Sequence, residues 1–202
     1  MKLPLALYGP EIRFDVHRDG EHIGVHRVTI DSTARSLTVR SEADFEIVFL
    51  GVFSYRYVYR STAEWIDGDL HRLAAEVNDD GDSASLTAMR TGARMRLDVN
   101  GQTTMTEAPI LPTNHWNANV IGARRVLNTL TGNVNNVAVV RQAREPIPTE
   151  RGPVMATRYA YTGDLNTEVW YDDAGRWVKL RFKGRDGVPI DYRCRLCQGG
   201  PQ

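Results

Sequence analysis

Turn-forming residue pairs recur along this chain at the spacing of β-hairpins. Asp-Gly and Asn-Gly suit the positive φ angles of tight two-residue turns. The segments between the pairs alternate apolar and polar residues, which places the apolar ones on one face of a strand. The pairs are Asp19-Gly20, Asp67-Gly68, Asp80-Gly81, Asn100-Gly101, Ala174-Gly175 and Asp186-Gly187. The pattern predicts an all-β chain, an antiparallel barrel or strongly curved half-barrel of about ten to twelve strands.

One segment departs from this alternation. Between Asn119 and Leu130 the apolar residues recur three and four positions apart, which is the spacing of a helix. Asn117 or Asn119 can cap its start, and Gly132 can end it. The spacing predicts one helix of about three turns over residues 119–130, and such a helix would close one side of the barrel.

Length and charge limit the function classes. A chain of 202 residues is expected to form a single domain over residues 1–202. Lys and Arg total 25, as do Asp and Glu, so no basic field favours a nucleic-acid partner. No apolar run approaches the roughly 20 residues that span a bilayer. The oligomeric state stays open, and so does the location: cytoplasmic if Met1 is the native start, periplasmic if a leader was removed.

Motifs for metals and cofactors are missing from the sequence. The five histidines lack metal-ligand spacing, and no phosphate-binding or dinucleotide-binding glycine motif occurs. We therefore predict neither a metal nor a cofactor. Cys194 and Cys197 are the only cysteines. We interpret them as two free thiols, with a disulfide near the C-terminus as the alternative.

A run of tyrosines gives the first candidate site. Tyr55, Tyr57 and Tyr59 recur at period two, so on a strand they share one face. We expect them to line a concave pocket, with Arg56 or His115 at its mouth to hold a polar head. The alternative interpretation is that the tyrosines are core aromatics with satisfied hydroxyl groups.

The segment Asn114-His115-Trp116-Asn117 gives the second candidate site, because it lies in a predicted loop just before the predicted helix. His115 is a candidate acid or base near neutral pH. Trp116 and Asn117 are candidate ligand contacts. In the structural alternative, Trp116 anchors the loop in the core and Asn117 caps the helix.

Three further residues complete the candidate set. Glu64 follows the tyrosines and is the candidate partner of His115 in acid–base chemistry, because aromatic surroundings raise a carboxyl pKa. Glu64 can equally pair with an arginine on its own strand. Trp65 and Trp170 are candidate ligand contacts.

Several marks together resemble a bacterial family of uncharacterised, mostly exported β-rich domains. They run from residue 12 to residue 193 and comprise Phe14-Asp15-Val16, Asp19-Gly20, Ile23-Gly24-Val25-His26, Tyr55-x-Tyr57, Glu64-x3-Gly68-x-Leu70, Trp116-Asn117, Leu130-Thr131-Gly132, Trp170-Tyr171-Asp172 and Asp186-Gly187-x-x-Ile190-x-Tyr192. The resemblance implies a shape similar to the lipoprotein-carrier half-barrels of the LolA and LolB type. It implies no catalytic residues.

Three functions fit these observations. The first is binding of a hydrophobic or aromatic small molecule by a carrier or sensor. The second is a cofactor-independent lyase, cyclase, isomerase or hydratase that uses His115 and Glu64 as acid and base. The third is an envelope assembly factor that binds a protein strand at a sheet edge.

Overall fold

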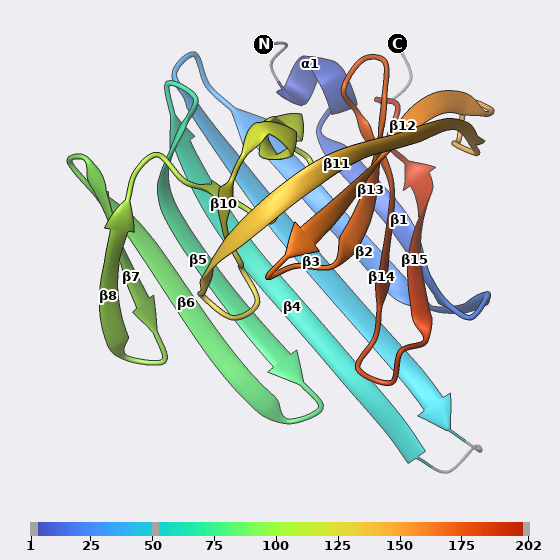
Figure 1. Cartoon of the computed structure of the whole chain (residues 1–202), viewed down its shortest axis with the longest axis horizontal. Coiled ribbons are helices and arrows are strands. Elements are labelled where there is room, and N and C mark those ends of the chain that lie inside the picture. The colour runs from blue at the N-terminus through green and yellow to red at the C-terminus, as the bar shows by residue number, and fades with distance from the viewer. Residues whose placement is uncertain (1–3, 50–52, 200–202) are drawn as a thin grey trace.

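All strands that the structure describes belong to one sheet (Figure 1). The computed structural model describes residues 4–49 and 53–199. Their 15 strands follow the order β8-β7-β6-β5-β4-β3-β2-β1-β15-β14-β13-β12-β11-β10-β9. Neighbouring strands are antiparallel, except that β9 and β10 are parallel.

The elements have the following bounds: α1 (Pro4–Tyr8), β1 (Glu11–Arg18), β2 (Glu21–Ser32), β3 (Ser36–Phe49), β4 (Phe53–Ile66), β5 (Asp69–Asp79), β6 (Asp82–Thr91), β7 (Arg94–Val99), β8 (Gln102–Glu107), β9 (Leu111–Pro112), η1 (Ala118–Gly122), β10 (Arg125–Leu127), β11 (Val134–Ile147), β12 (Val154–Gly163), β13 (Thr167–Asp172), β14 (Trp177–Lys183) and β15 (Pro189–Leu196). Neither α1 nor the 3-10 helix η1 is long and apolar enough to cross a membrane.

The predicted hairpin turns form where the residue pairs lie. The first residue of four of these pairs has a φ angle between 49° and 55°, and the glycine that follows also has a positive φ angle. These four residues are Asp19, Asp67, Asp80 and Asn100. Two successive positive φ angles match the right-handed twist of the flanking strands, which explains why Asp-Gly and Asn-Gly join them.

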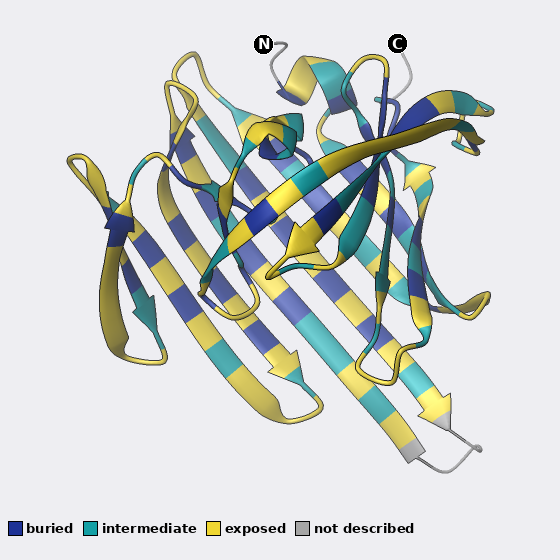
Figure 2. Cartoon of the chain, in the orientation of Figure 1, coloured by how far each residue is buried: buried dark blue, intermediate teal, exposed yellow. Residues whose placement is uncertain are grey.

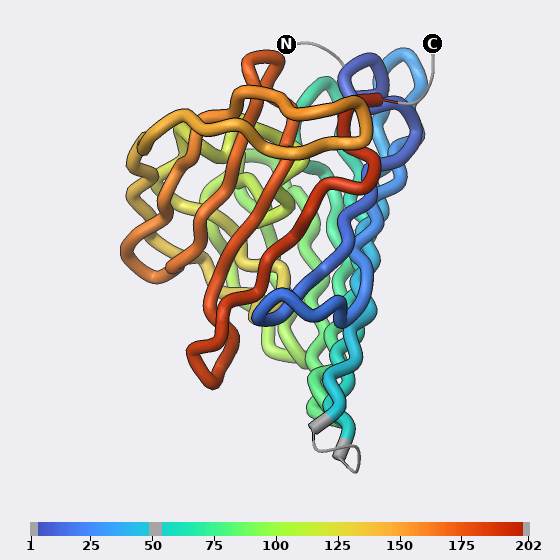
Figure 3. Tube along the Cα trace, turned by 90° about the vertical axis from the view of Figure 1, so that its right-hand side faces the viewer, coloured from blue at the N-terminus to red at the C-terminus, as the bar shows by residue number. Residues whose placement is uncertain are grey.

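The sheet curls so that its two halves face each other (Figures 1 and 3). Strands β2 to β6 form one long wall, and β11 to β15 cross in front of it. The two end strands β8 and β9 leave the sheet unclosed. Side chains bridge part of the gap, because Arg125 on β10 contacts Glu107 at 3.1 Å and Thr106 at 2.6 Å on β8. The predicted curved antiparallel sheet is confirmed, and the barrel is incomplete.

Burial alternates along the long strands, as Figure 2 shows by colour. Inward residues form one apolar core between the two halves. The outward face carries opposite charges on neighbouring strands: Arg27 lies opposite Glu42, Glu42 opposite Arg60, and Arg60 opposite Glu76. This alternation keeps the outer face in water and favours the observed register.

The predicted helix over residues 119–130 is wrong. Residues 118–122 form η1 instead, and residues 125–127 form β10. The apolar spacing arises because Val126 and Leu127 are buried while paired with β9 and β11. Strand pairing therefore overrides the helical periodicity. The strand number also exceeds the predicted ten to twelve, partly because β9 and β10 are too short to show alternation.

Candidate functional site

A cavity of about 650 Å³ lies between the two halves of the sheet. Tyr55, Tyr57 and Tyr59 all line it, because they share the inward face of β4 as their spacing predicts. Its other walls come mainly from β2, β3, β14 and β15 and from the loop before η1. They include Ile23, Val28, Ala43, Phe45, Ile47, Leu180, Phe182, Ile190 and Tyr192. The walls are thus mostly apolar and aromatic.

The cavity has two ends that differ in polarity. The mouth lies where β1 and β5 end and where the hairpin joins β14 to β15, and Arg18, Asp79 and Arg185 stand there. The deep end lies toward the start of β14, where His26 and His115 both pack against Trp177, with ring centroids 5.7 and 5.8 Å apart.

Polar atoms without protein partners gather among the deep lining side chains. They are Nδ1 of His26, Nδ1 of His115, Oγ of Ser41, Nδ2 of Asn114, Nε1 of Trp116 and Oη of Tyr161. Buried polar atoms normally find hydrogen-bond partners, and leaving one unpaired costs about 1–3 kcal/mol. These six side chains therefore place buried polar groups in the walls of the cavity, close to any hydrogen-bonding molecule or ordered water inside it.

Both deep histidines are neutral at pH 7. Burial lowers the pKa of His115 to about 4. Burial also lowers the pKa of His26 to about 3, and the neighbouring His115 contributes in the same direction. A neutral imidazole has one donor and one acceptor nitrogen. The deep end thus offers hydrogen bonds of both kinds and no positive charge.

Three tyrosines fix the loop that carries His115. The Tyr171 hydroxyl donates to the His115 carbonyl at 2.8 Å. Tyr8 donates to the Trp116 carbonyl at 2.9 Å and accepts from the Trp177 backbone N–H at 2.7 Å. Tyr59 lies within hydrogen-bond distance of Asn114. The loop is therefore held to α1, β4 and β13 at once, and this holds the His115 ring in place.

Ion pairs cross the mouth. Arg18 pairs with Asp186 at 2.5 Å within the mouth rim. Arg185 pairs with Asp79, which also accepts a hydrogen bond from the Tyr55 hydroxyl. Burial and the bond to Asp79 raise the Tyr55 pKa to about 12, so its hydroxyl keeps its proton. These contacts connect the β14–β15 hairpin to the ends of β1 and β5.

The structure brings only part of the predicted site together. His115 and Trp116 line the cavity beside the tyrosines. Glu64 is exposed on the outer face of β4, away from His115. Arg56 also points outward and pairs with Asp44 at 3.0 Å, so it does not stand at the mouth.

The other predicted contacts have structural roles. Trp65 is buried behind Trp116, with their rings edge to face at 5.4 Å. Asn117 caps η1, because its side chain accepts from the Asn119 backbone N–H. Trp170 donates to Glu145 at 2.5 Å and lies outside the cavity lining.

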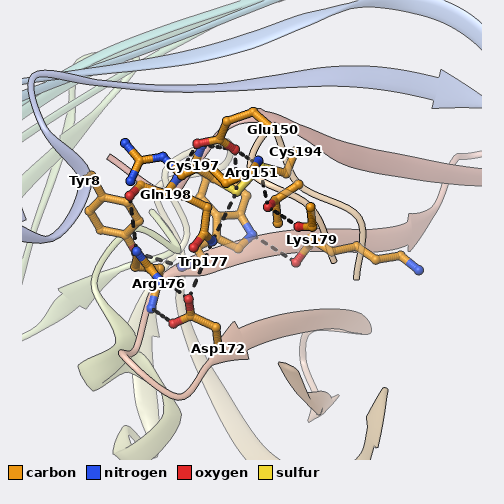
Figure 4. Close-up of a disulfide and its surroundings, with 12 residues drawn as sticks. Tyr8, Glu150, Arg151, Asp172, Arg176, Trp177, Lys179, Cys194, Cys197 and Gln198 are labelled. Atoms are coloured by element: carbon orange, nitrogen blue, oxygen red, sulfur yellow. Dashed lines mark hydrogen bonds and ion pairs between the residues drawn. A yellow bond between two sulfur atoms is a disulfide. The ribbon is translucent and has the colours of Figure 1, made fainter. Parts of the chain in front are cut away.

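The two cysteines form a disulfide (Figure 4), so the interpretation as free thiols is wrong. The carboxylate of Glu150 accepts the backbone N–H groups of Cys197 and Gln198, at 3.2 and 2.8 Å. These contacts fix the turn that brings Cys194 and Cys197 together. Glu150 and the two sulfur atoms are close enough to hold a metal ion, but disulfide sulfurs lack the thiolate charge that binds one.

A family model for a domain of unknown function, DUF6134, matches residues 14–195. The chain belongs to the DUF6134 family. The matched stretch corresponds closely to residues 12–193, over which the family marks in the sequence lie. No curated protein matches the chain in sequence.

The fold of this DUF6134 chain is similar to a solved structure. That structure is a beta-barrel-like protein with a domain of unknown function, DUF1849, from Brucella abortus. The TM-score is 0.65 at 11% identity, over 93% of this chain and 96% of the other. At this identity the likeness shows the fold alone, which is beta-barrel-like.

Several lining residues of the DUF6134 chain went unrecognised in the sequence. His26 lies two and four positions before the buried Val28 and Ile30, so alternation along β2 would have placed it on the same inward face. Arg18 likewise lies two and four positions after the buried Val16 and Phe14, which places it on the inward face of β1. Lys183, the last residue of β14, alternates with the inward Phe182, and Arg185 lies in the turn that follows, so alternation predicts neither of them at the mouth.

Proposed function

We propose that the protein binds a hydrophobic or aromatic small molecule in this cavity, as a carrier or sensor. The cavity carries the proposal. Its volume of about 650 Å³ lies in the range of small-molecule sites, and its walls are apolar with few polar groups, as in such sites. His26 and His115 are among those polar groups, because both line the cavity and their neutral rings can hydrogen-bond to a ligand.

The acid–base alternative has less support. An enzyme of the expected kind needs two ionisable groups that converge on one point of a pocket. Glu64 lies outside the cavity, and among the described lining residues carboxylates stand only at the mouth. The strand-binding alternative needs an open sheet edge. At the β8 edge, Arg125 contacts Thr106 and Glu107 and takes up part of the space.

An exported location fits the proposed carrier role. The disulfide between Cys194 and Cys197 supports it, because such bonds persist in oxidising compartments and are rare in the cytosol. The resemblance to mostly exported domains with a lipoprotein-carrier shape points the same way. We therefore propose a carrier or sensor of the bacterial envelope.

Native mass spectrometry of the protein purified from its own host tests the proposal. We expect an additional mass that is released on denaturation and belongs to an apolar or aromatic compound. The Ala43→Phe variant, which fills the cavity, should lose it, whereas Ala75→Phe in the core away from the cavity should retain it. An equal retained mass in both variants would place the molecule elsewhere and contradict the proposal.

A further inference from the structure

The charged residues of the cavity are confined to its mouth. Arg18, Asp79, Lys183, Arg185 and Asp186 are the charged side chains among the described lining residues. Among these lining residues three cations stand beside two carboxylates, and the neighbouring Asp80 also acts on Tyr55. Lys183 is exposed at the end of β14 and makes no ion pair within the described part of the chain.

The existing ion pairs at the mouth leave Arg185 open to an incoming anion. The Arg185 and Asp186 side chains are 76% and 50% exposed, whereas their partners Asp79 and Arg18 are 15% and 20% exposed. Because water reaches Arg185, an incoming anion can approach its guanidinium group, while Asp79 keeps the hydrogen bond from the Tyr55 hydroxyl. Lys183 offers the anion a second cation. Arginine binds carboxylate and phosphate groups in a two-pronged geometry that favours this contact.

The deep end has the opposite preference. His26 and His115 are neutral there, and the remaining unpartnered groups belong to uncharged side chains. A buried charge without a partner of opposite sign is strongly disfavoured. A hydroxyl or carbonyl group carries no charge, so it suffers no such penalty, and it can hydrogen-bond to a neutral imidazole ring.

From this polarity we infer the class and orientation of the ligand: an amphipathic molecule with an apolar body, a carboxylate or phosphate at Lys183 and Arg185, and a neutral hydroxyl or carbonyl group at His26 and His115. The inference rests on the proposed function, since it assumes that the cavity binds a ligand. It adds which end of the ligand enters first and which charge stays at the mouth.

A series of straight-chain probes tests the inference by equilibrium binding. Alkanoates of increasing length first define the length that binds best. The alkanol, the alkyl phosphate, the protonated alkylamine and the ω-hydroxyalkanoate of that length then differ only at their ends. We expect the alkanoate or the alkyl phosphate to bind about tenfold tighter than the alkanol, and the amine to bind weakest. The ω-hydroxyl should add about threefold to the alkanoate affinity.

Variants assign each gain to one end of the cavity. In the Lys183→Gln, Arg185→Gln double variant, the alkanoate should bind no more tightly than the alkanol. In His115→Phe, which keeps a ring of similar shape, the ω-hydroxyalkanoate should bind no more tightly than the alkanoate. Arg56→Gln removes an arginine from the outer face and serves as the matched control, which should alter neither ratio.

The outcomes separate the inference from the proposed function. If the alkanol or the amine binds as tightly as the alkanoate, the cavity binds ligands but the inferred polarity is wrong. If the ω-hydroxyl lowers affinity, or its gain survives His115→Phe, the deep end does not receive it. If no probe of any length binds, the proposed function itself fails. The alkanoate and the alkyl phosphate distinguish a fatty-acid type of head from a phospholipid type.

Discussion

The Arg185 guanidinium group pairs with the Asp79 carboxylate across the mouth of the cavity, although the two residues are 106 positions apart in the sequence. One belongs to the hairpin between β14 and β15, and the other ends β5. The pair therefore connects the two facing halves of the sheet at the point where a ligand must enter. Its place follows from the curl of the sheet and from no local feature of the sequence.

This relationship predicts opposite effects of two neutralising changes. Asp79→Asn removes the carboxylate that competes for Arg185, so we expect alkanoate affinity to rise about threefold. Arg185→Gln should lower it. Arg185→Gln should change the free energy of unfolding by less than about 1 kcal/mol, because the arginine is exposed. Asp79→Asn should cost about 1–3 kcal/mol, because the mostly buried carboxylate also accepts from the Tyr55 hydroxyl. Titration calorimetry and urea denaturation measure the two quantities, and a fall in affinity in Asp79→Asn would contradict this competition.

Acidification should destabilise the fold through the deep histidines. The unfolded chain protonates them near pH 6.5, whereas in the fold burial holds the pKa of His115 to about 4 and that of His26 to about 3. Between these values the unfolded state binds more protons, so stability falls as pH falls from about 6.5 toward 4. The slope is about 1.4 kcal/mol per pH unit for each histidine.

Urea denaturation between pH 7 and pH 5 measures this slope. At these pH values the ion-paired carboxyl groups with lowered pKa, such as Glu11 and Asp186, remain ionised and contribute little. His115→Phe should remove a large part of the slope and His26→Phe a further large part, and His17, whose pKa burial also lowers, should account for a smaller remainder. Equal slopes in the parent and the double variant would show that other groups cause the pH dependence.

Gly24 on β2 should tolerate no side chain. A Cβ atom there would lie 2.0 Å from the Asp44 carbonyl oxygen and 2.9 Å from the Phe45 Cα, both on the paired strand β3. Because backbone atoms cannot move aside locally, we expect Gly24→Ala to lower the free energy of unfolding by about 2–4 kcal/mol. Gly122→Ala has open space around its Cβ and is the matched control, with a change within about 0.5 kcal/mol. Equal stabilities of the two variants would refute the close approach of β2 and β3.

Reduction of the disulfide should have a modest effect. The bond between Cys194 and Cys197 closes a short loop, which limits its stabilisation to about 2 kcal/mol. We expect a reductant to lower the Tm by about 4–8 °C for a chain of this length. The Cys194→Ser, Cys197→Ser double variant should start at the lower Tm and respond to no reductant. If the parent loses no stability and alkylates without reductant, the cysteines are free thiols.

Strand alternation carried most of what the sequence could predict. It placed Tyr55, Tyr57 and Tyr59 on one face, and that face lines the cavity. The same parity rule puts Arg56 and Glu64 on the opposite face, where the structure has them exposed. The expectation that Arg56 and Glu64 join the pocket relied on their closeness to the tyrosines in the sequence. It did not take into account that alternation places them on the other face of β4.

The remaining errors come from long-range contacts. The helical spacing of residues 119–130 results from burial of Val126 and Leu127 between β9 and β11, and a local window cannot detect such partners. The mouth pair of Arg185 and Asp79 depends on the curl of the whole sheet. A sequence window therefore predicts which face of a strand is inward, but it cannot predict which distant strand faces it.

Binding of a neutral apolar fluorescent dye tests most directly whether the cavity is a ligand site. Ala43 lines the cavity and Ala75 lies in the packed core, and each is 3% exposed. Ala43→Phe, or Ala43→Leu if the larger residue prevents folding, should abolish saturable dye binding with little loss of stability, because it fills empty space. Ala75→Phe should keep dye binding but lose about 1–3 kcal/mol through overpacking. Saturable binding that survives in a folded Ala43 variant at the parent affinity would contradict the account.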